Sequence, residues 1–209
     1  MPANLEVMTY PSGPIETNGY LVIDPETSHA LIVDAPTDLG AAVLPEIKRR
    51  NLMIDAIVIT HGHWDHIGDT VPLKRTLDVP VIAHRLSVPR LEKPGSSMMS
   101  LPVTIEPITP DQLIAEGDTV ALGDHSFAVW HLPGHEPGHI VLISLADNVM
   151  LGGDVLFPNG HGRIDILGAN AADMAESLRR LTTLPDTITV YPGHGNPTTI
   201  GQERSWLPV

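Results

Sequence analysis

Four potential metal ligands stand within six residues: His61, His63, Asp65 and His66. Imidazole and carboxylate groups are nitrogen and oxygen ligands that zinc accepts. The four ligands directly follow the residues Ile54–Thr60, whose apolar pattern predicts a buried strand. His61 and His63 are two residues apart, so extended backbone would point both side chains to one side, toward a single cation. Asp65 and His66 follow a turn of the chain and can face a second cation, so the segment predicts a metal site.

Further ligands are expected at the ends of later strands, because such a cation needs four or five donors from several directions. One candidate follows each of three later apolar runs, and each stands directly after a glycine: His135, Asp154 and His194. The Pro-Gly pair before His135 predicts a tight turn. If these strands end at one edge of a sheet, all the donors meet there.

The order of these motifs resembles the metallo-β-lactamase superfamily, and its spacing is most similar to the glyoxalase II-like branch. The motifs are His-x-His-x-Asp-His at 61–66, Pro-Gly-His at 133–135, Gly-Asp at 153–154 and Gly-His-Gly at 193–195. Weaker similarities lie at 18–20, 33–35 and 162–163, so the resemblance covers nearly the whole chain. The resemblance implies that three residues hold a first metal: His61, His63 and His135. It implies that three others hold a second metal, with Asp154 bridging the two: Asp65, His66 and His194.

The resemblance implies a metal-dependent hydrolase. A water between two dications is deprotonated near neutral pH, because even one zinc lowers the pKa of bound water to about 7. The expected reaction is attack of this bridging hydroxide on a thioester, as in glyoxalase II. Asp65 and Asp154 are the expected catalytic carboxylates, and Asp65 would also orient the hydroxide. Zinc is the expected metal, and iron or manganese also accepts these donors.

Two other activities of the same superfamily stay open. A lactonase acting on acyl homoserine or other lactones would need an apolar channel, which Met98, Met99 and Leu101 can supply. A persulfide dioxygenase would use one iron on two histidines and the bridging aspartate, but a complete second ligand set argues against a single metal. A β-lactamase is disfavoured because those enzymes depart from this pattern at the second metal. A scaffold that binds metal without catalysis is a further alternative.

Several polar residues near the motifs have two interpretations. Arg163 is either a surface charge or a contact for a substrate carboxylate. Asp34 either supports a metal ligand or forms a turn, and Trp64 either packs in the core or lines the site. His139 is expected to steady a ligand or the turn rather than to bind metal. The remaining histidines are expected at the surface or satisfied in the core: His29, His84, His125, His131 and His161.

The elements that must position these residues follow from hydrophobic patterning. Strands are predicted at Asn4–Met8, Tyr20–Ile23, Ala30–Val33, Ile54–Thr60, Pro80–Ala83, Thr119–Leu122, Phe127–His131, Ile140–Ser144, Val149–Gly152 and Ile188–Tyr191. Helices are predicted at Leu39–Arg50, Asp69–Leu77, His84–Leu91 and Ala171–Leu181. This order predicts an α/β (α+β) fold, a four-layer αβ/βα sandwich of two mixed sheets flanked by helices, in one domain over 1–209. The resemblance is to the short form without the extra C-terminal domain. The Pro-rich segment 92–111 is either a surface connection or a flap over the site.

Composition restricts the partners. The chain carries 12 Lys and Arg against 25 Asp and Glu, a formal charge of −13, which repels nucleic acid. The absence of cysteine excludes thiolate ligands and disulfides. No export signal or membrane-spanning run is visible. We therefore expect a cytoplasmic protein with a small-molecule substrate, without nucleic-acid or membrane partners, and the sequence leaves its oligomeric state open.

Overall fold

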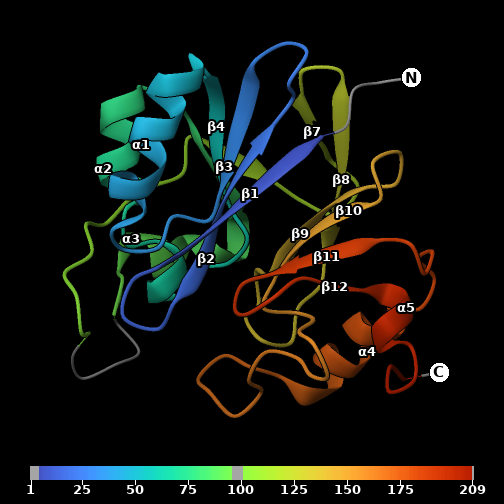
Figure 1. Cartoon of the computed structure of the whole chain (residues 1–209). Coiled ribbons are helices and arrows are strands. Elements are labelled where there is room, and N and C mark those ends of the chain that lie inside the picture. Colours follow the sequence, from blue (N-terminus) through green and yellow to red (C-terminus); the bar gives the residue numbers. More distant parts are fainter. Residues whose placement is uncertain (1–4, 96–100, 209) are drawn as a thin grey trace.

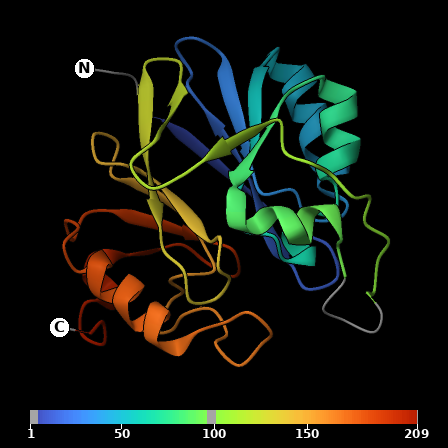
Figure 2. The same cartoon turned by 180° about the vertical axis from the view of Figure 1, so that it is seen from behind.

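Two six-stranded sheets pack face to face, and helices lie on their outer faces (Figure 1). The computed structural model describes residues 5–95 and 101–208. The view from behind shows the same four layers, with α1 and α2 over one sheet and α4 over the other (Figure 2). This arrangement confirms the predicted sandwich of two mixed sheets flanked by helices.

The first sheet has the order β1-β2-β3-β4-β5-β6. Its strands are β1 (Glu6–Ser12), β2 (Thr17–Ile23), β3 (His29–Val33), β4 (Met53–Ile59), β5 (Val81–His84) and β6 (Gln112–Ile114). β1, β2 and β3 pair antiparallel, and β3 to β6 pair parallel. Parallel neighbours need crossover connections. Here these contain α1 (Leu39–Arg50), α2 (Thr70–Leu77) and α3 (Val88–Glu92).

The second sheet has the order β12-β11-β10-β9-β8-β7. Its strands are β7 (Thr119–Leu122), β8 (His125–His131), β9 (Ile140–Ser144), β10 (Val149–Gly153), β11 (Thr189–Pro192) and β12 (Thr198–Thr199). Only β10 and β11 pair parallel among these neighbours, and the helix α4 (Ala171–Leu181) connects them. The short helix α5 (Ile200–Glu203) follows β12.

Burial explains why the central strands are apolar on both faces. Along β2, Leu21 and Ile23 belong to the core under α1, while Tyr20 and Val22 belong to the core between the sheets. Successive side chains of a strand point to opposite faces, so a strand covered on both sides has no polar face. A third core, which includes Met174 of α4, covers the outer face of the second sheet.

The structure corrects some of the predicted elements. The predicted helix His84–Leu91 is wrong at its start: β5 continues to His84, a 3₁₀ turn follows over Arg85–Ser87, and α3 begins only at Val88. His84 has extended backbone, and its Nδ1 accepts from the Leu86 N–H at 3.4 Å, which supports the turn instead.

Short elements were also missed. β6, β12 and α5 have two to four residues each, too few to show a periodic pattern. The predicted strand Asn4–Met8 is shifted, since β1 extends to Ser12, and Asn4 lies outside the described residues. In 92–111, the described residues after Glu92 form no helix or strand, and Met98 and Met99 lie outside the described residues. Within 5–95 and 101–208, no helix is long and apolar enough to cross a membrane.

Candidate metal centre

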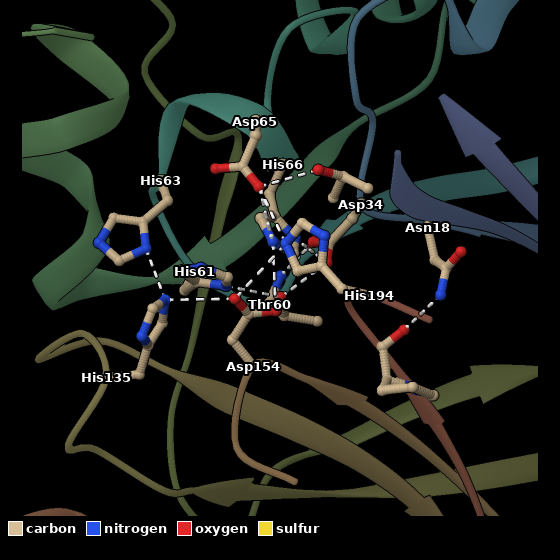
Figure 3. A network of polar contacts seen from close by, with 12 residues as sticks. Asn18, Asp34, Thr60, His61, His63, Asp65, His66, His135, Asp154 and His194 are labelled. Atoms are coloured by element: carbon tan, nitrogen blue, oxygen red, sulfur yellow. Dashed lines mark hydrogen bonds and ion pairs between the residues drawn. The ribbon is translucent and has the colours of Figure 1, made fainter. Parts of the chain in front are cut away.

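The predicted ligands meet where strands of both sheets end (Figure 3). The chain leaves β4 at Ile59 and turns through the 3₁₀ helix η1 (Trp64–His66), which carries two of them. Asp154 directly follows β10, and His194 comes two residues after β11. Sheet ends therefore bring together residues that are far apart in the sequence.

Three histidines form the first group: His61, His63 and His135. One ring nitrogen from each lies within 4.8 Å of the others. His63 Nδ1 and His135 Nε2 are 2.7 Å apart. His61 and His63 point to the same side, as the spacing predicted. His135 lies in the turn after β8, four residues beyond the strand end at His131.

The second group consists of Asp65, His66 and His194, whose ligand atoms also lie within 4.8 Å of one another. Asp65 Oδ2 is 3.2 Å from His194 Nε2 and 3.4 Å from His66 Nε2. Asp65 and His66, which both lie in η1, are buried. The turn after His63 therefore directs Asp65 and His66 toward His194, whereas His61 faces His135.

Asp154 lies between the two groups. Its Oδ2 is 3.3 Å from His135 Nε2 and 3.7 Å from His194 Nε2, and its Oδ1 is 3.4 Å from His66 Nε2. One carboxylate thus reaches the nitrogen donors of both groups. This is the position that a carboxylate shared by two cations would occupy.

The far nitrogen of three of these rings faces a protein oxygen. His61 Nδ1 lies 3.1 Å from Thr60 Oγ1, His66 Nδ1 lies 2.8 Å from Asp34 Oδ2, and His135 Nδ1 lies 2.8 Å from the carbonyl of Arg163. Hydrogen bonds of this kind hold the ring of a metal-binding histidine and leave its Nε2 lone pair available.

Three atoms of the donor set are among the buried polar atoms that have no hydrogen-bond partner within the described ranges: His61 Nε2, His66 Nε2 and Asp154 Oδ1. A buried polar atom without a partner costs about 1–3 kcal/mol. All three face the space between the groups. Divalent metal ions would satisfy them, so the donor set fits metal binding.

Electrostatics also favour cations at this centre. Burial lowers the pKa of His61 well below its ordinary value and, together with His135, lowers the pKa of His63 to about 3, so both rings are neutral ligands. Burial would lower the pKa of His66 as well, but the carboxylates of Asp65, Asp34 and Asp154 raise it well above its ordinary value. The negative potential of these carboxylates therefore stabilises positive charge at His66 Nε2.

Asp34 and His139 support the ligands rather than completing the set. Asp34 belongs to a third group of close donors with His61 and His66, but its carboxylate already accepts from Thr60 N at 2.8 Å, Thr60 Oγ1 at 2.7 Å and His66. The structure therefore favours the first interpretation of Asp34, support of a metal ligand; its φ of 57° is left-handed, but it lies in no assigned turn. His139 Nε2 accepts from the backbone N–H of Asp154 at 2.9 Å, as expected of a residue that steadies a ligand.

Sequence reasoning missed two residues of β2. The Thr17 hydroxyl donates to Asp65 Oδ2 at 2.8 Å, and the Asn18 amide donates to the carbonyls of Pro192 and Gly195 at 2.9 Å each. The Asn18-Gly19-Tyr20 similarity was the available signal for Asn18. No signal marked Thr17, because its contact with Asp65 spans 48 positions.

Most of the other histidines lie away from the donors, as predicted. His29 Nδ1 pairs with Asp55 at 2.6 Å and His125 Nδ1 with Asp147 at 2.9 Å. The rings of His84 and His131 stack at a centroid distance of 4.3 Å. His161 differs from these histidines, since it is half-buried and lines the cavity over the centre.

A cavity of about 510 Å³ opens over the two groups. Its walls contain Trp64, Leu101 and Arg163. Trp64 combines both of its interpretations, because it also packs against the first core. The Arg163 side chain lines the cavity, is exposed and pairs with Asp165 at 2.9 Å. Its contact with a substrate carboxylate stays a prediction.

Comparison with known proteins decides the family. The family model described as "Metallo-beta-lactamase superfamily" matches residues 12–194. The chain belongs to this superfamily. Hydroxyacylglutathione hydrolase GloC of Haemophilus influenzae is 33% identical over 215 residues, which cover 98% of this chain and 97% of that protein.

Two solved structures are similar over 97% of this chain. The crystal structure of BLEG-1 B3 metallo-beta-lactamase has a TM-score of 0.88 and 33% identity, with 98% of that chain covered. The crystal structure of TTHA1623 in a di-iron-bound form has a TM-score of 0.86 and 35% identity, with 99% covered. The superfamily resemblance is confirmed, and the names of these proteins point to more than one activity.

Proposed function

We propose that this superfamily member hydrolyses an acyl thioester, in the manner of the glyoxalase II-like branch, with two divalent metal ions. Water would add to the carbonyl carbon, the C–S bond would break, and an acid and a thiol would leave. The observation that carries the proposal is the position of Asp154 between two complete groups of donors. The relationship to hydroxyacylglutathione hydrolase GloC supports the thioester as substrate.

The proposed ligand set divides as the two groups do. The first metal would be held by His61, His63 and His135, the second by Asp65, His66 and His194, with Asp154 shared. When bound, such ions polarise a carbonyl oxygen and lower the pKa of coordinated water.

The protein's own residues would position the reactants. Asp65 lines the cavity, and the Thr17 hydroxyl and His194 hold its carboxylate, so Asp65 can accept a hydrogen bond from a water molecule and orient it. Asp154 separates the two groups at a fixed spacing, because its backbone N–H is held by His139. Fixed donors of this kind contribute to catalysis by orienting the reacting groups in advance.

Zinc is the metal that we propose first. Five imidazoles and two carboxylates suit zinc, and they also suit iron and manganese. The di-iron-bound form of TTHA1623 makes iron the specific competitor. Oxidation of a persulfide on a single iron needs only part of this set, whereas all seven donors converge here.

A lactone is the second candidate substrate. Trp64, Leu101 and Phe157 give the cavity an apolar wall that fits an acyl chain. The similarity to a B3 metallo-beta-lactamase adds a penicillin to the substrates that must be compared.

Metal analysis and a substrate panel test the proposal. We expect two equivalents of metal per purified chain and the highest kcat/KM for a thioester such as S-lactoylglutathione, compared with an N-acyl homoserine lactone, a penicillin and a phosphodiester. Asp154→Ala and His63→Ala should remove this activity, and His29→Ala, whose ring pairs with Asp55, is the matched control. Full turnover by metal-free protein would contradict the mechanism, and one iron per chain with oxygen consumption would favour the dioxygenase.

A further inference from the structure

The cavity over the metal centre has two chemically different sides. Among its lining residues are three cationic side chains, Arg90, Lys93 and Arg163, and several apolar ones. Its lining carboxylates, within the described residues, are Asp65 and Asp154, both proposed as metal ligands. A chain with 25 Asp and Glu against 12 Lys and Arg thus presents mainly positive charge at the walls of this cavity. The positions of the cationic and apolar side chains therefore indicate which chemical groups the substrate carries.

The cations lie toward the first group of donors. Arg163 follows Gly162, and its backbone carbonyl faces His135 at 2.8 Å. Arg90 lies against Gly62, between His61 and His63 in the sequence, since a Cβ added at Gly62 would be 2.8 Å from the Cβ of Arg90. Lys93 comes directly after α3, the helix that carries Arg90.

Two of these cations can turn to a ligand at little cost. Lys93 is exposed, and no carboxylate lies within ion-pair distance of it in the part of the chain that the structure describes. The ion pair between Arg163 and Asp165 is open to solvent on both sides, with side-chain exposures of 69% and 70%. Exposed pairs of this kind contribute little stability, so exchanging Asp165 for a substrate anion costs little. Arg90 is held more firmly, since it donates to the Leu167 carbonyl at 2.6 Å.

Apolar residues lie on both sides, since the Leu167 carbonyl accepts from Arg90, but toward the second group the described lining residues include no Lys or Arg. The Phe157 ring packs edge-on to His194 with a centroid distance of 6.1 Å. Ile15 is 50% exposed and stands two residues before Thr17, which binds Asp65 and pairs with the backbone of His194. A half-exposed isoleucine at the wall of a cavity leaves apolar surface that a substrate can cover.

From this asymmetry we infer that the substrate is an amphipathic anion, with a carboxylate on the side of Lys93 and Arg163 and a hydrocarbon group on the side of Ile15 and Phe157. The inference rests on the proposed function only for the scissile bond that joins the two halves. A cavity of about 510 Å³ has room for both. The inference excludes small neutral lactones as preferred ligands.

Unreactive thioethers test this inference by binding, without any turnover. The probes are 3-(hexylthio)propanoate, its primary amide and 3-(methylthio)propanoate, each measured by calorimetry on the metal-replete protein. We expect the hexyl carboxylate to bind about tenfold more tightly than its amide, an effect of the size of one charge-assisted hydrogen bond. We expect it to bind at least about tenfold more tightly than the methyl carboxylate, because added methylene groups are buried.

Variants test the cationic side and the apolar side of the cavity separately. Lys93→Gln should reduce the preference for carboxylate over amide about threefold, and the double variant with Arg163→Gln should abolish it. The matched control is Lys48→Gln, an equal loss of charge on the exposed face of α1, which should leave the preference unchanged. Ile15→Ser should reduce only the preference for hexyl over methyl, and Ile15→Leu should retain it.

Equal binding of carboxylate and amide, equal binding of hexyl and methyl, or no binding of any probe would overturn the inference. An equal effect of Lys48→Gln would overturn the assignment to Lys93. The proposed function fails differently: if thioesters are not hydrolysed but the thioethers show both preferences, the inference stands and the thioester assignment is wrong. If thioesters are hydrolysed and neither preference is found, the thioester assignment stands and the inference about the substrate's two ends is wrong.

Discussion

Asp34 and His66 form a fully buried pair, in which Asp34 Oδ2 lies 2.8 Å from His66 Nδ1. The same oxygen accepts from the Thr60 hydroxyl, and that hydroxyl lies 3.1 Å from His61 Nδ1. One carboxylate therefore orients a ring from each group of donors.

Asp34→Asn should lower metal affinity about 10- to 100-fold. The amide oxygen can still accept from the Thr60 N–H, but the amide nitrogen then faces His66 Nδ1. Two donors cannot share that contact, so the ring must carry its proton on Nε2, where it blocks metal binding. Asparagine tolerates the φ of 57° at this position, so the backbone should be retained.

Competition with a chelator measures the change in metal affinity. The matched control is Asp55→Asn, which alters another carboxylate–histidine pair, with His29, outside the centre. If Asp34→Asn and the wild type release metal at the same chelator concentration, the orienting role of Asp34 is refuted.

Gly193→Ala should reduce activity about 100-fold while every donor is retained. A Cβ at this position would lie 2.0 Å from Asp154 Oδ1 and 2.7 Å from His66 Cε1, so the carboxylate must move. A displacement of about 1 Å at a reacting centre can cost about that factor. The control is Gly160→Ala, which meets no atom within 4 Å in the described residues. Steady-state kinetics with circular dichroism separate misplacement from unfolding, and normal kcat/KM in Gly193→Ala would show that the position of Asp154 is not critical.

The ligands were predictable because their types are improbable in an ordinary loop. His61, His63, Asp65 and His66 stand after a strand whose apolar pattern is unambiguous, and the turn at η1 separates them into two pairs as expected. The same reasoning found Asp154 because a glycine and an acid after a buried strand have no role in a core.

The remaining features depend on tertiary contacts that a single sequence does not reveal. Asn18 binds the carbonyl of Pro192, a contact across 174 positions. His84 was predicted to begin a helix, but pairing of β5 with β6 extends the strand through it. His161 has no motif, and it lines the cavity in a loop that is held at the centre by the hydrogen bond from the Gly162 N–H to the Asp154 carbonyl at 3.0 Å.

Asp24→Asn should destabilise the protein at neutral pH and less so in acid. The Asp24 carboxylate is buried and accepts from Thr27 Oγ1 at 2.8 Å and from backbone N–H groups that include those of Glu26 and Asp124 at 2.9 and 3.1 Å. Burial alone would raise the pKa of Asp24, but these hydrogen bonds outweigh it and hold the pKa below 3.8. Because the folded pKa is lowered, the stabilisation is complete above pH 3.8 and is lost as the pH falls through the folded value.

Urea unfolding at several pH values tests this linkage. The variant should lose about 1–3 kcal/mol at pH 7, as expected when hydrogen bonds to a buried charged group are disrupted. The difference from wild type should shrink as the pH falls below 3.8. A difference that stays constant down to pH 2 would show that ionisation of Asp24 does not contribute.

Thr17→Val should weaken the second metal site selectively. Valine keeps the shape of the buried threonine but removes the hydroxyl that donates to Asp65 Oδ2 at 2.8 Å. That oxygen also faces His66 and His194, so the lost hydrogen bond loosens a ligand of the second group and leaves the first group intact. In a metal titration followed by calorimetry, the affinity of one equivalent should fall about tenfold or more, while the other is unchanged. Thr17→Ser restores the hydroxyl and should restore the affinity, whereas an equal loss at both equivalents would mean that Thr17 supports the fold rather than Asp65.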